Sequence, residues 1–317
     1  MPQPLISLVV PVYRAEAYLP ACVQSIRAQR YGELDVVCVD DGSPDRCPEL
    51  LDRYAREDAR IRVIHQPNAG QAAARNAGVA AARGAYLTFV DSDDQIEPDL
   101  VGSLLRAMTQ AGADAAICDA RTFHGDAPPA PAKRGGVEVM TGAQAMRRML
   151  YQRDYDTAPW GKMYRTELVR AHPFPEGRIF EDLFAVYRML FDAERVAYVR
   201  EPLYLYRINP EGTMRQAFRP AVLDAADAAD EIVSFAQSRC PEALPAALAR
   251  RFSAYCQVLR WMRGVGPGDP LYARKVSLWR AIRADRRRML ADAQARPKNR
   301  AAAACTLLGM NLFSRLR

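Results

Sequence analysis

The chain has 317 residues, of which half are hydrophobic and 26% are charged, and its net charge is +7 at pH 7. This balance predicts a folded protein with a large core and excludes a disordered chain. Because no apolar run reaches the roughly 18 residues of a membrane span and the N-terminus lacks a basic signal-peptide start, we expect a soluble cytoplasmic protein.

The first 120 residues alternate between strand-like and helix-like stretches. Apolar runs predict strands at residues 5–12, 34–41, 60–65, 85–91 and 113–120. Helices are predicted near residues 16–29, 45–58 and 70–84, and from Pro98 onward. Near-continuous apolar strands separated by helices predict an α/β fold with a mostly parallel sheet covered on both faces. Such a sheet binds its ligand beyond the carboxyl ends of the strands.

The rest of the chain is predicted to be mainly helical. The Pro/Gly/Ala-rich residues 125–136 predict a mobile loop, and two short strands are expected at 195–199 and 202–207. Helices are predicted at 141–152, at 181–194 and from about 221 to the end, with breaks at Pro241, 264–270 and Pro297.

Cysteine spacing gives no sign of a disulfide framework or a metal centre. The seven cysteines form no CxxC pair, and Cys38 and Cys118 stand inside strand-like runs where small core residues are expected. This usage suits a reducing compartment.

Five acids fall within nine positions of the stretch "DSDDQIEPD", at Asp91, Asp93, Asp94, Glu97 and Asp99. Residues i and i+2 of an extended or turn segment point the same way, so Asp91 and Asp93 can share one face. Hard oxygen ligands in small number suit Mg²⁺ or Mn²⁺. A calcium hand does not fit, because Ile96 stands where that loop needs glycine. Glu97 and Asp99 have a simpler explanation, as acids near the start of a helix at Pro98.

Other polar residues follow the neighbouring predicted strands. "VDDGS" ends the second strand, "PVY" ends the first, and Asn68, Gly70 and Arg75 begin the helix before the fourth. These strand ends are expected to converge on one crevice. Neither GxGxxG nor GxxxxGK[ST] is present, so dinucleotide and P-loop binding are not supported.

Four segments together resemble glycosyltransferase family 2 in colinear order: "SLVVPVYRAEAYLPACVQSIRAQ", "VVCVDDGSPD", "NAGQAAARNAGVAAARGAYLTFVDSDD" and "WGKMYRTEL…FPEGRIFEDLFAVYRML". The resemblance implies a GT-A fold and an inverting, metal-dependent hexosyltransferase that uses a nucleotide-diphosphate sugar, with UDP as the expected nucleotide. It further implies a role in bacterial capsule, exopolysaccharide or lipopolysaccharide synthesis. The expected domains are a GT-A domain at 1–215 (nucleotide part about 1–120, acceptor part about 137–215) and a helical region at 216–317.

The resemblance also implies roles on the donor side. Around the nucleobase these residues are Pro11, Tyr13 and Asp41, with Asn68 and Arg75 nearby. Asp91 is expected at the ribose, and Ser92 is a further nucleotide-sugar-binding residue. Asp93 is expected to bind Mn²⁺ or Mg²⁺, with Asp91 and Asp94 as possible metal ligands. Simpler roles remain open: Tyr13 in the core, Arg75 paired with Asp41 or Asp91, and Asp94 as a helix cap or a support behind the metal.

On the acceptor side the resemblance implies that Asp182 is the general base and that Glu181 orients the acceptor or sugar. Both could instead be first-turn acids that complement a helix dipole. Trp160 and Lys162 resemble the acceptor segment, although Trp160 could equally be a core residue. Arg207 and Thr213 resemble a motif that approaches the diphosphate. No histidine stands where some relatives bind metal, so a histidine ligand is not expected.

The positive charge lies in the C-terminal tail. Residues 271–317 contain twelve Lys or Arg and two Asp, a net charge of +10 that leaves −3 for residues 1–270. Arginines beside Trp279, Leu307, Leu308 and Phe313 predict either interfacial helices on an anionic membrane or a helical subdomain packed on the body. Nucleic acid is not an expected partner, because no recognition module is present.

Two rival functions remain at this stage. A catalytically silent sugar-nucleotide-binding homologue could serve as an assembly module, although the retained "DSDD" and "ED" acids argue against it. A basic membrane- or nucleic-acid-binding protein is the second rival. We expect a peripheral protein on the inner face of the cytoplasmic membrane that takes a nucleotide sugar and a saccharide or lipid-linked acceptor.

Overall fold

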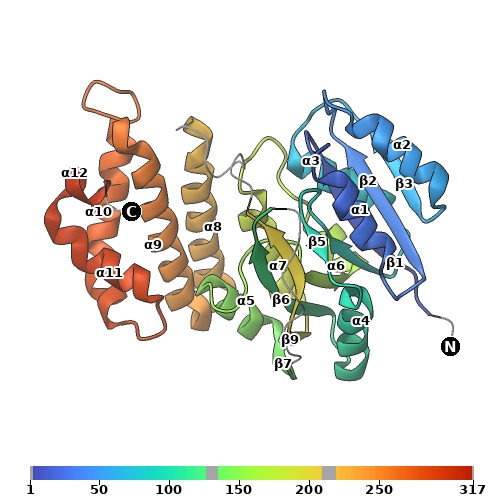
Figure 1. Ribbon diagram of the computed structural model, residues 1–317. Coiled ribbons are helices and arrows are strands. Elements are labelled where there is room, and N and C mark those ends of the chain that lie inside the picture. The colour runs from blue at the N-terminus through green and yellow to red at the C-terminus, as the bar shows by residue number, and fades with distance from the viewer. Residues whose placement is uncertain (1–2, 126–134, 209–218, 316–317) are drawn as a thin grey trace. The chain divides into compact units, whose positions relative to one another are not determined.

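The computed structural model describes residues 3–125, 135–208 and 219–315 (Figure 1). The chain forms two compact units. We call the first the sheet unit; it contains Met1–Ala145, Ala158–Gly177 and Arg188–Gly212. The second, the helical unit, contains Met146–Thr157, Arg178–Tyr187 and Thr213–Arg317. The chain therefore passes between the units several times, and the expected boundary near residue 215 stays a prediction.

Strands β1 (Ile6–Val12), β2 (Leu34–Asp40), β3 (Ile61–His65) and β4 (Tyr86–Phe89) form the parallel half of the sheet. β1 lies between β2 and β4, and β3 pairs with β2 on the far side. Every residue of β1 and β2 is buried, as continuous apolar strands require when both faces are covered. These four predicted strands are confirmed.

The helices between these strands are also confirmed, with shorter bounds than predicted. They are α1 (Leu19–Arg27), α2 (Cys47–Glu57), α3 (Gln71–Ala81) and α4 (Leu100–Ala111). α4 ends in a left-handed glycine, Gly112, with a φ of 57°. All seven cysteines are free, and Cys38 and Cys118 are buried in the core as predicted.

The other half of the sheet is more mixed than the apolar runs predicted. The strands are β5 (Gln95–Ile96), β6 (Ala115–Phe123), β7 (Val137–Thr141), β8 (Lys162–Arg165) and β9 (Arg195–Arg207). β8 runs antiparallel between β4 and β6, and β9 runs parallel to β6 and antiparallel to β5 and β7. β5, β7, β8 and the short helix α6 (Thr166–Ala171) were not predicted.

The two short strands predicted at 195–199 and 202–207 are wrong as separate elements, because β9 is one strand of 13 residues. Pro202, at which the prediction broke the strand, pairs with Asp119 where the register against β6 shifts. A proline is tolerated at such an irregularity, since the ladder is interrupted there. Residues 126–134 of the predicted loop lie outside the described residues.

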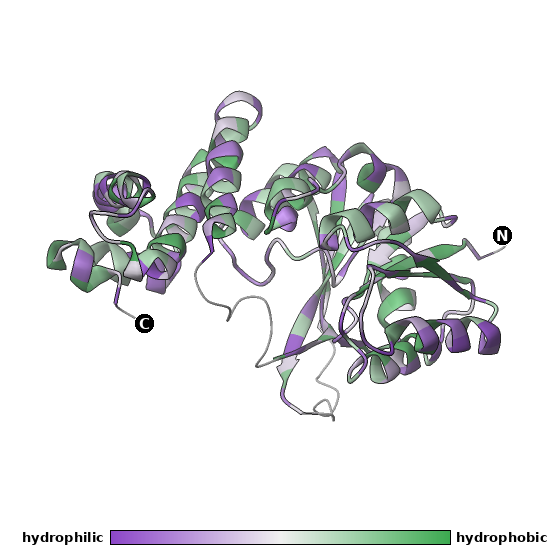
Figure 2. Cartoon of the chain, turned by 90° about the horizontal axis from the view of Figure 1, so that it is seen from above, coloured by the Kyte–Doolittle hydropathy of each residue, from purple (hydrophilic) through white to green (hydrophobic). Residues whose placement is uncertain are grey.

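The helical unit contains most of α5 (Gly142–Leu150), the start of α7 (Glu181–Asp192), and the C-terminal helices α8 (Asp224–Arg239), α9 (Leu244–Trp261), α10 (Tyr272–Ala291), α11 (Pro297–Cys305) and α12 (Met310–Phe313). Helix breaks lie near Pro241, 264–270 and Pro297, as predicted. The helices carry alternating hydrophilic and hydrophobic bands (Figure 2), as helices that bury one face do. None of the described helices combines the length and the apolar character that crossing a membrane demands.

Gly78 allows α3 to lie close against β1, which gives a stability prediction. A Cβ atom at Gly78 would lie 2.4 Å from Cγ1 of the buried Val9, whereas one at Gly102 in α4 would meet nothing within 4 Å. Gly78→Ala should therefore lower the free energy of unfolding by about 1–3 kcal/mol. Gly102→Ala should raise it by about 0.5–1 kcal/mol. Urea unfolding followed by circular dichroism measures the free energy of unfolding of both variants. If Gly78→Ala and Gly102→Ala change it equally, the close packing of α3 on β1 is contradicted.

Candidate active site

The turn after β4 carries the acids that the sequence singled out. Asp94 points into the protein and is 1% exposed; its carboxylate accepts hydrogen bonds from the Tyr204 hydroxyl at 2.7 Å and the Arg207 backbone N–H at 2.8 Å. Burial, with the charges of Asp91 and Asp93, raises the pKa of Asp94 to about 9. Asp94 thus holds the turn from inside, in line with the supporting role left open above.

Asp91 is held by a buried arginine. Arg75 in α3 is 2% exposed and donates from Nη2 to Oδ1 of Asp91 at 3.0 Å, while its guanidinium lies 5.5 Å from the ring centre of Phe174. The Asp91 backbone N–H donates to the Tyr204 hydroxyl at 3.1 Å. Of the two acids considered as partners of Arg75, Asp41 and Asp91, the structure shows the pair with Asp91.

Asp93 keeps a half-buried side chain at the same turn, beside the buried Ser92. The turn is fixed from behind by Arg207, which is 4% exposed and donates from Nε to the Asp93 carbonyl at 2.9 Å. The Arg207 guanidinium lies against the rings of Phe123 (4.6 Å) and Tyr18 (5.1 Å). Arg207 therefore supports the turn. Its predicted companion Thr213 lies outside the described residues.

The end of β2 organises the loop that leads into α3. Asp41 is 3% exposed and accepts hydrogen bonds from the Gln66 side chain at 2.8 Å and from the backbone N–H groups of Ala69 and Gly70 at 2.9 Å each. Gly42, with a φ of 66°, follows at once, and a Cβ atom there would lie 2.7 Å from the Asn68 nitrogen. The two loops thus approach closely because position 42 has no side chain.

The remaining donor-side residues lie nearby at the ends of these strands. Pro11 is buried in β1 next to β2 and β4, whereas Tyr13, just after β1, is 44% exposed. Asn68 is exposed in the loop that Asp41 holds. A core role for Tyr13 is therefore wrong, since its ring faces solvent with the Arg14 guanidinium 5.4 Å from its centre.

Trp160 belongs to an aromatic stack. Its ring lies 4.4 Å from that of Tyr204, at an interplanar angle of 9°, and 5.4 Å from that of Tyr206. Because Tyr204 also bonds the acidic turn, this stack and the turn form one packed group. Lys162 is 2% exposed and donates from Nζ to the Ala158 carbonyl at 2.6 Å, which fixes the segment before Trp160.

The "ED" acids lie in the helical unit, in the first turn of α7. Thr157 donates from its hydroxyl to Oδ2 of Asp182 at 2.8 Å, and Glu181 is buried. Phe180, directly before the helix, has a φ of 59° and stacks on Trp261 at 5.6 Å. A left-handed conformation in a bulky residue is strained, and such strain often marks functional sites.

The oxygen donors at the turn fit a divalent metal that binds few protein ligands. Among the described residues no group of three or more His, Cys, Asp or Glu side chains is placed to hold a metal ion. Asp93 supplies a partly accessible carboxylate next to Asp91, and both are hard donors. Mg²⁺ and Mn²⁺ accept such a set, because substrate phosphates and water complete their coordination.

Sequence reasoning missed Tyr204 and Thr157, which position the acids. Tyr204 stands in a predicted strand, and its alternation with Leu203 and Leu205 shows the face on which it lies but not its partner. Thr157 had no motif to reveal it. Both act through tertiary contacts with residues far away in sequence.

Solved structures place this architecture in the GT-A class. The Staphylococcus aureus TarS fragment 1–349 in complex with UDP-GlcNAc covers 98% of this chain, which covers 89% of that one, with a TM-score of 0.68 and 20% identity. The mannosyltransferase PcManGT from Pyrobaculum calidifontis, in complex with GDP-Man and Mn²⁺, aligns over 98% of this chain and 86% of its own, with a TM-score of 0.53 and 14% identity. The fold is therefore GT-A.

The sequence comparisons give the family. Residues 7–172 match glycosyl transferase family 2. EpsH of Bacillus subtilis (strain 168) is 36% identical over 215 residues, which are 66% of this chain and 62% of EpsH. The chain belongs to glycosyl transferase family 2, as its motifs predicted, and it spans less than two thirds of the length of EpsH.

The Tyr204 hydroxyl gives a second stability prediction. Tyr204→Phe leaves the buried Asp94 carboxyl and the Asp91 N–H each without one partner, so the free energy of unfolding should fall by about 1–3 kcal/mol. Tyr13→Phe removes a hydroxyl from an exposed ring and should change it by less than about 0.5 kcal/mol. Urea titrations of the wild type and the two variants measure the free energy of unfolding. If Tyr204→Phe has the same free energy of unfolding as the wild type, the Tyr204 hydroxyl does not hold the turn.

Proposed function

We propose that this protein is an inverting hexosyltransferase that moves a sugar from a UDP-sugar to a hydroxyl of a saccharide or lipid-linked acceptor in bacterial surface polysaccharide synthesis. The observation that carries the proposal is the fixed "DSDD" turn beyond β4, held by Arg75, Tyr204 and Arg207 in a chain of glycosyl transferase family 2. The UDP-GlcNAc complex of TarS supports a UDP-sugar as donor.

On the donor side, the nucleotide lies over the ends of β1, β2 and β4. The exposed ring of Tyr13 stacks on the base. Asp41 already accepts two backbone N–H groups and one side-chain amide; its Oδ2 atom accepts one of these bonds and can accept another from a base N–H. Asp91, held in place by Arg75, accepts from the ribose hydroxyls, with Ser92 beside it and Asn68 on the facing loop.

Asp93 holds the divalent metal, and Asp94 acts behind it through the turn. The Mn²⁺ in the PcManGT complex supports this metal class. When bound, the metal stabilises negative charge that develops on the departing diphosphate. Arg207 does not approach the diphosphate in this scheme, because its guanidinium is committed to the Asp93 carbonyl and two aromatic rings.

Asp182 is the general base. It takes the proton of the acceptor hydroxyl while that oxygen forms a bond to the anomeric carbon, and the bond from this carbon to the diphosphate oxygen breaks on the opposite face. The configuration therefore inverts. Thr157 orients the Asp182 carboxylate by donating to Oδ2. Glu181 orients the acceptor or sugar, and Trp160 offers a ring face for it.

Substitutions of Asp93 and Asp182 should affect different steps, donor binding and sugar transfer. Asp93→Asn should lose the part of the melting-temperature rise with UDP-GlcNAc that depends on Mn²⁺, because the metal ligand is gone. Asp182→Asn should keep that rise and transfer sugar at least about 100-fold more slowly, because proton transfer is lost. Thermal-shift assays and product formation measure these effects.

Asp99→Asn is the matched control, since Asp99 belongs to the same acidic stretch but pairs with Arg30 at 2.6 Å. It should retain metal-dependent donor binding and transfer. If Asp93→Asn still shows the full Mn²⁺-dependent rise, the metal assignment is wrong; if Asp182→Asn transfers normally, the base is elsewhere.

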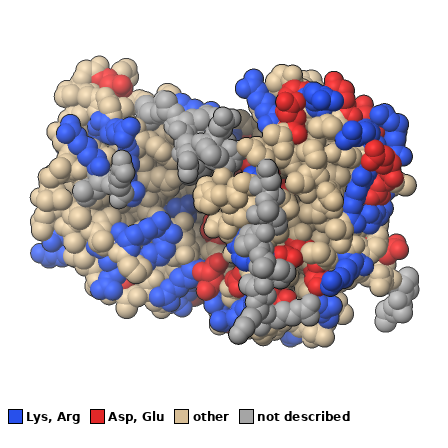
Figure 3. Space-filling model, in the orientation of Figure 1, with Lys and Arg blue, Asp and Glu red and all other residues tan. Residues whose placement is uncertain are grey.

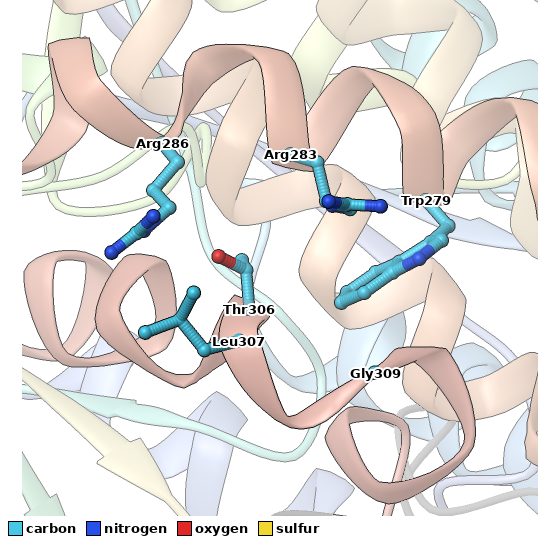
Figure 4. A pocket seen from close by; sticks show the side chains of 6 residues that line it. All are labelled: Trp279, Arg283, Arg286, Thr306, Leu307 and Gly309. Carbon is cyan, nitrogen blue, oxygen red and sulfur yellow. The ribbon is translucent and has the colours of Figure 1, made fainter.

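A membrane-facing surface is a second part of this proposal. Leu307, Leu308 and Leu312 are 72%, 49% and 51% exposed, and we call them the apolar patch. Arg283 and Arg286 extend from α10 on the side of Thr306 and Leu307 (Figure 4), around a cavity of about 250 Å³. Lys and Arg also gather over the C-terminal helices in Figure 3, with few acids among them. Apolar side chains beside arginines match an anionic lipid surface.

The apolar patch can be tested by lipid binding. Replacement of Leu307, Leu308 and Leu312 by Asp should lower co-sedimentation with phosphatidylglycerol vesicles about tenfold or more, because three apolar contacts become repulsive. Val137 and Val139 of β7 are each 51% exposed and serve as matched controls when changed to Asp. Equal losses from both sets would indicate unspecific binding, and no loss from the leucines would contradict this surface.

A further inference from the structure

Arg250 is a buried cation whose contacts within the protein are incomplete. It lies on α9, is 7% exposed, and its Nε has no hydrogen-bond partner among the described residues. Burial lowers the pKa of Arg250, and the charges of Asp182 and Asp156 act against this effect. A buried polar group without a partner is uncommon in native proteins and calls for an explanation.

More positive charge lies against the same face of α9. Arg296 donates from Nη2 to the hydroxyl of Ser253 at 3.1 Å, and Ser253 is three residues after Arg250. Asn299 donates to the Ala249 carbonyl at 3.3 Å, so the first turn of α11 rests on this part of α9. The Nε of Arg296 also has no hydrogen-bond partner among the described residues.

The charges in this region repel one another. Burial and the charge of Arg250 lower the pKa of Arg296 to about 10, against the favourable charge of Asp156. Partial burial, together with Arg296, Arg260 and Arg250, lowers the pKa of Lys298. We call Arg250, Arg296 and Lys298 the basic cluster. The N-terminus of the nine-residue helix α11 adds a further partial positive charge to it.

The two acids near the basic cluster do not balance it. Asp156 and Asp182 carry two negative charges against three full positive charges and a helix N-terminus. A bound anion would remove the repulsion and give partners to the Nε–H groups of Arg250 and Arg296, which have none among the described residues. Phosphate suits this arrangement best, because guanidinium groups bind its oxygens with two parallel hydrogen bonds and helix N-termini favour it.

We propose that the basic cluster binds a phosphate group of the acceptor. This inference rests on the proposed function, because the charge of Asp182, the base assigned there, acts on Arg250. The cluster thus selects acceptors that carry a phosphate ester near the attacking hydroxyl.

The test compares melting temperatures in phosphate and in chloride at equal ionic strength and pH 7, without metal. The wild-type protein should melt about 2–4 °C higher in phosphate. Arg250→Met removes the charge but keeps an apolar stem, so it should lose this rise and melt higher than wild type in chloride. A merely structural arginine would instead make Arg250→Met melt lower in both buffers, and that result would overturn the proposal.

Two further variants complete the design. Arg296→Gln should also lose the phosphate-dependent rise, and it replaces Arg250→Met if that protein does not fold. Arg280→Gln, on an exposed position of α10, should keep the rise. If Arg280→Gln loses the phosphate-dependent rise in melting temperature, the rise reflects general charge screening. If Arg250→Met and Arg296→Gln both keep that rise, phosphate binds elsewhere. Either outcome contradicts the proposal.

The source of the phosphate is settled with two probes. Dibutyl phosphate stands for a phosphodiester acceptor and farnesyl diphosphate for a lipid-linked one; at least one should raise the melting temperature of wild type but not of Arg250→Met. Stabilisation by inorganic phosphate alone would overturn the acceptor role. Mn²⁺-dependent UDP-GlcNAc binding is measured on the same proteins. If UDP-GlcNAc does not bind, the proposed function is contradicted and the phosphate result stands. If UDP-GlcNAc binds but phosphate does not raise the melting temperature, only the phosphate inference is contradicted.

Discussion

The buried carboxyl of Asp94 is the constraint on which the candidate donor site depends. Asp91, Asp93 and Asp94 would repel one another in an open loop. In the folded protein, burial raises the pKa of Asp94. Its carboxyl group accepts hydrogen bonds from the Tyr204 hydroxyl and the Arg207 backbone N–H, both in β9. Because β9 also pairs with β5, β6 and β7, the turn after β4 is fixed by strands formed much later in the chain. Asp91 and Asp93 thereby stay at the same turn with partly exposed side chains.

The parallel half of the sheet could be predicted from the sequence because its signals are local. β1 and β2 are buried along their whole length, and the Ala-rich α3 has a high intrinsic helix propensity. β8 could not be predicted, since its four residues gain their strand identity only by pairing between β4 and β6. The continuity of β9 across Pro202 likewise depends on its register against β6, which no single segment encodes.

The site itself was partly predictable for a similar reason. The acids after β4 could be located because they interrupt an apolar run, and the family motifs supplied Asp182 as the candidate base. Basic residues were harder to interpret, because a charge in a sequence does not reveal its partner. Arg75 and Arg207 both serve the acidic turn, and Arg250 lies buried on α9 without any motif around it. Burial of a cation is a tertiary property, so only the structure could distinguish these three.

The burial of the cysteines has a practical consequence. Burial raises the pKa of the thiols of Cys22, Cys38, Cys47, Cys118, Cys240 and Cys256, which keeps them in the unreactive thiol form at neutral pH. Cys305, at the end of α11, is the partly exposed one of the seven. A maleimide dye would therefore label the native protein mainly at this position, directly before Thr306 and Leu307. The chain thus carries its own attachment point for a fluorophore that reports on the polarity around the C-terminal helices.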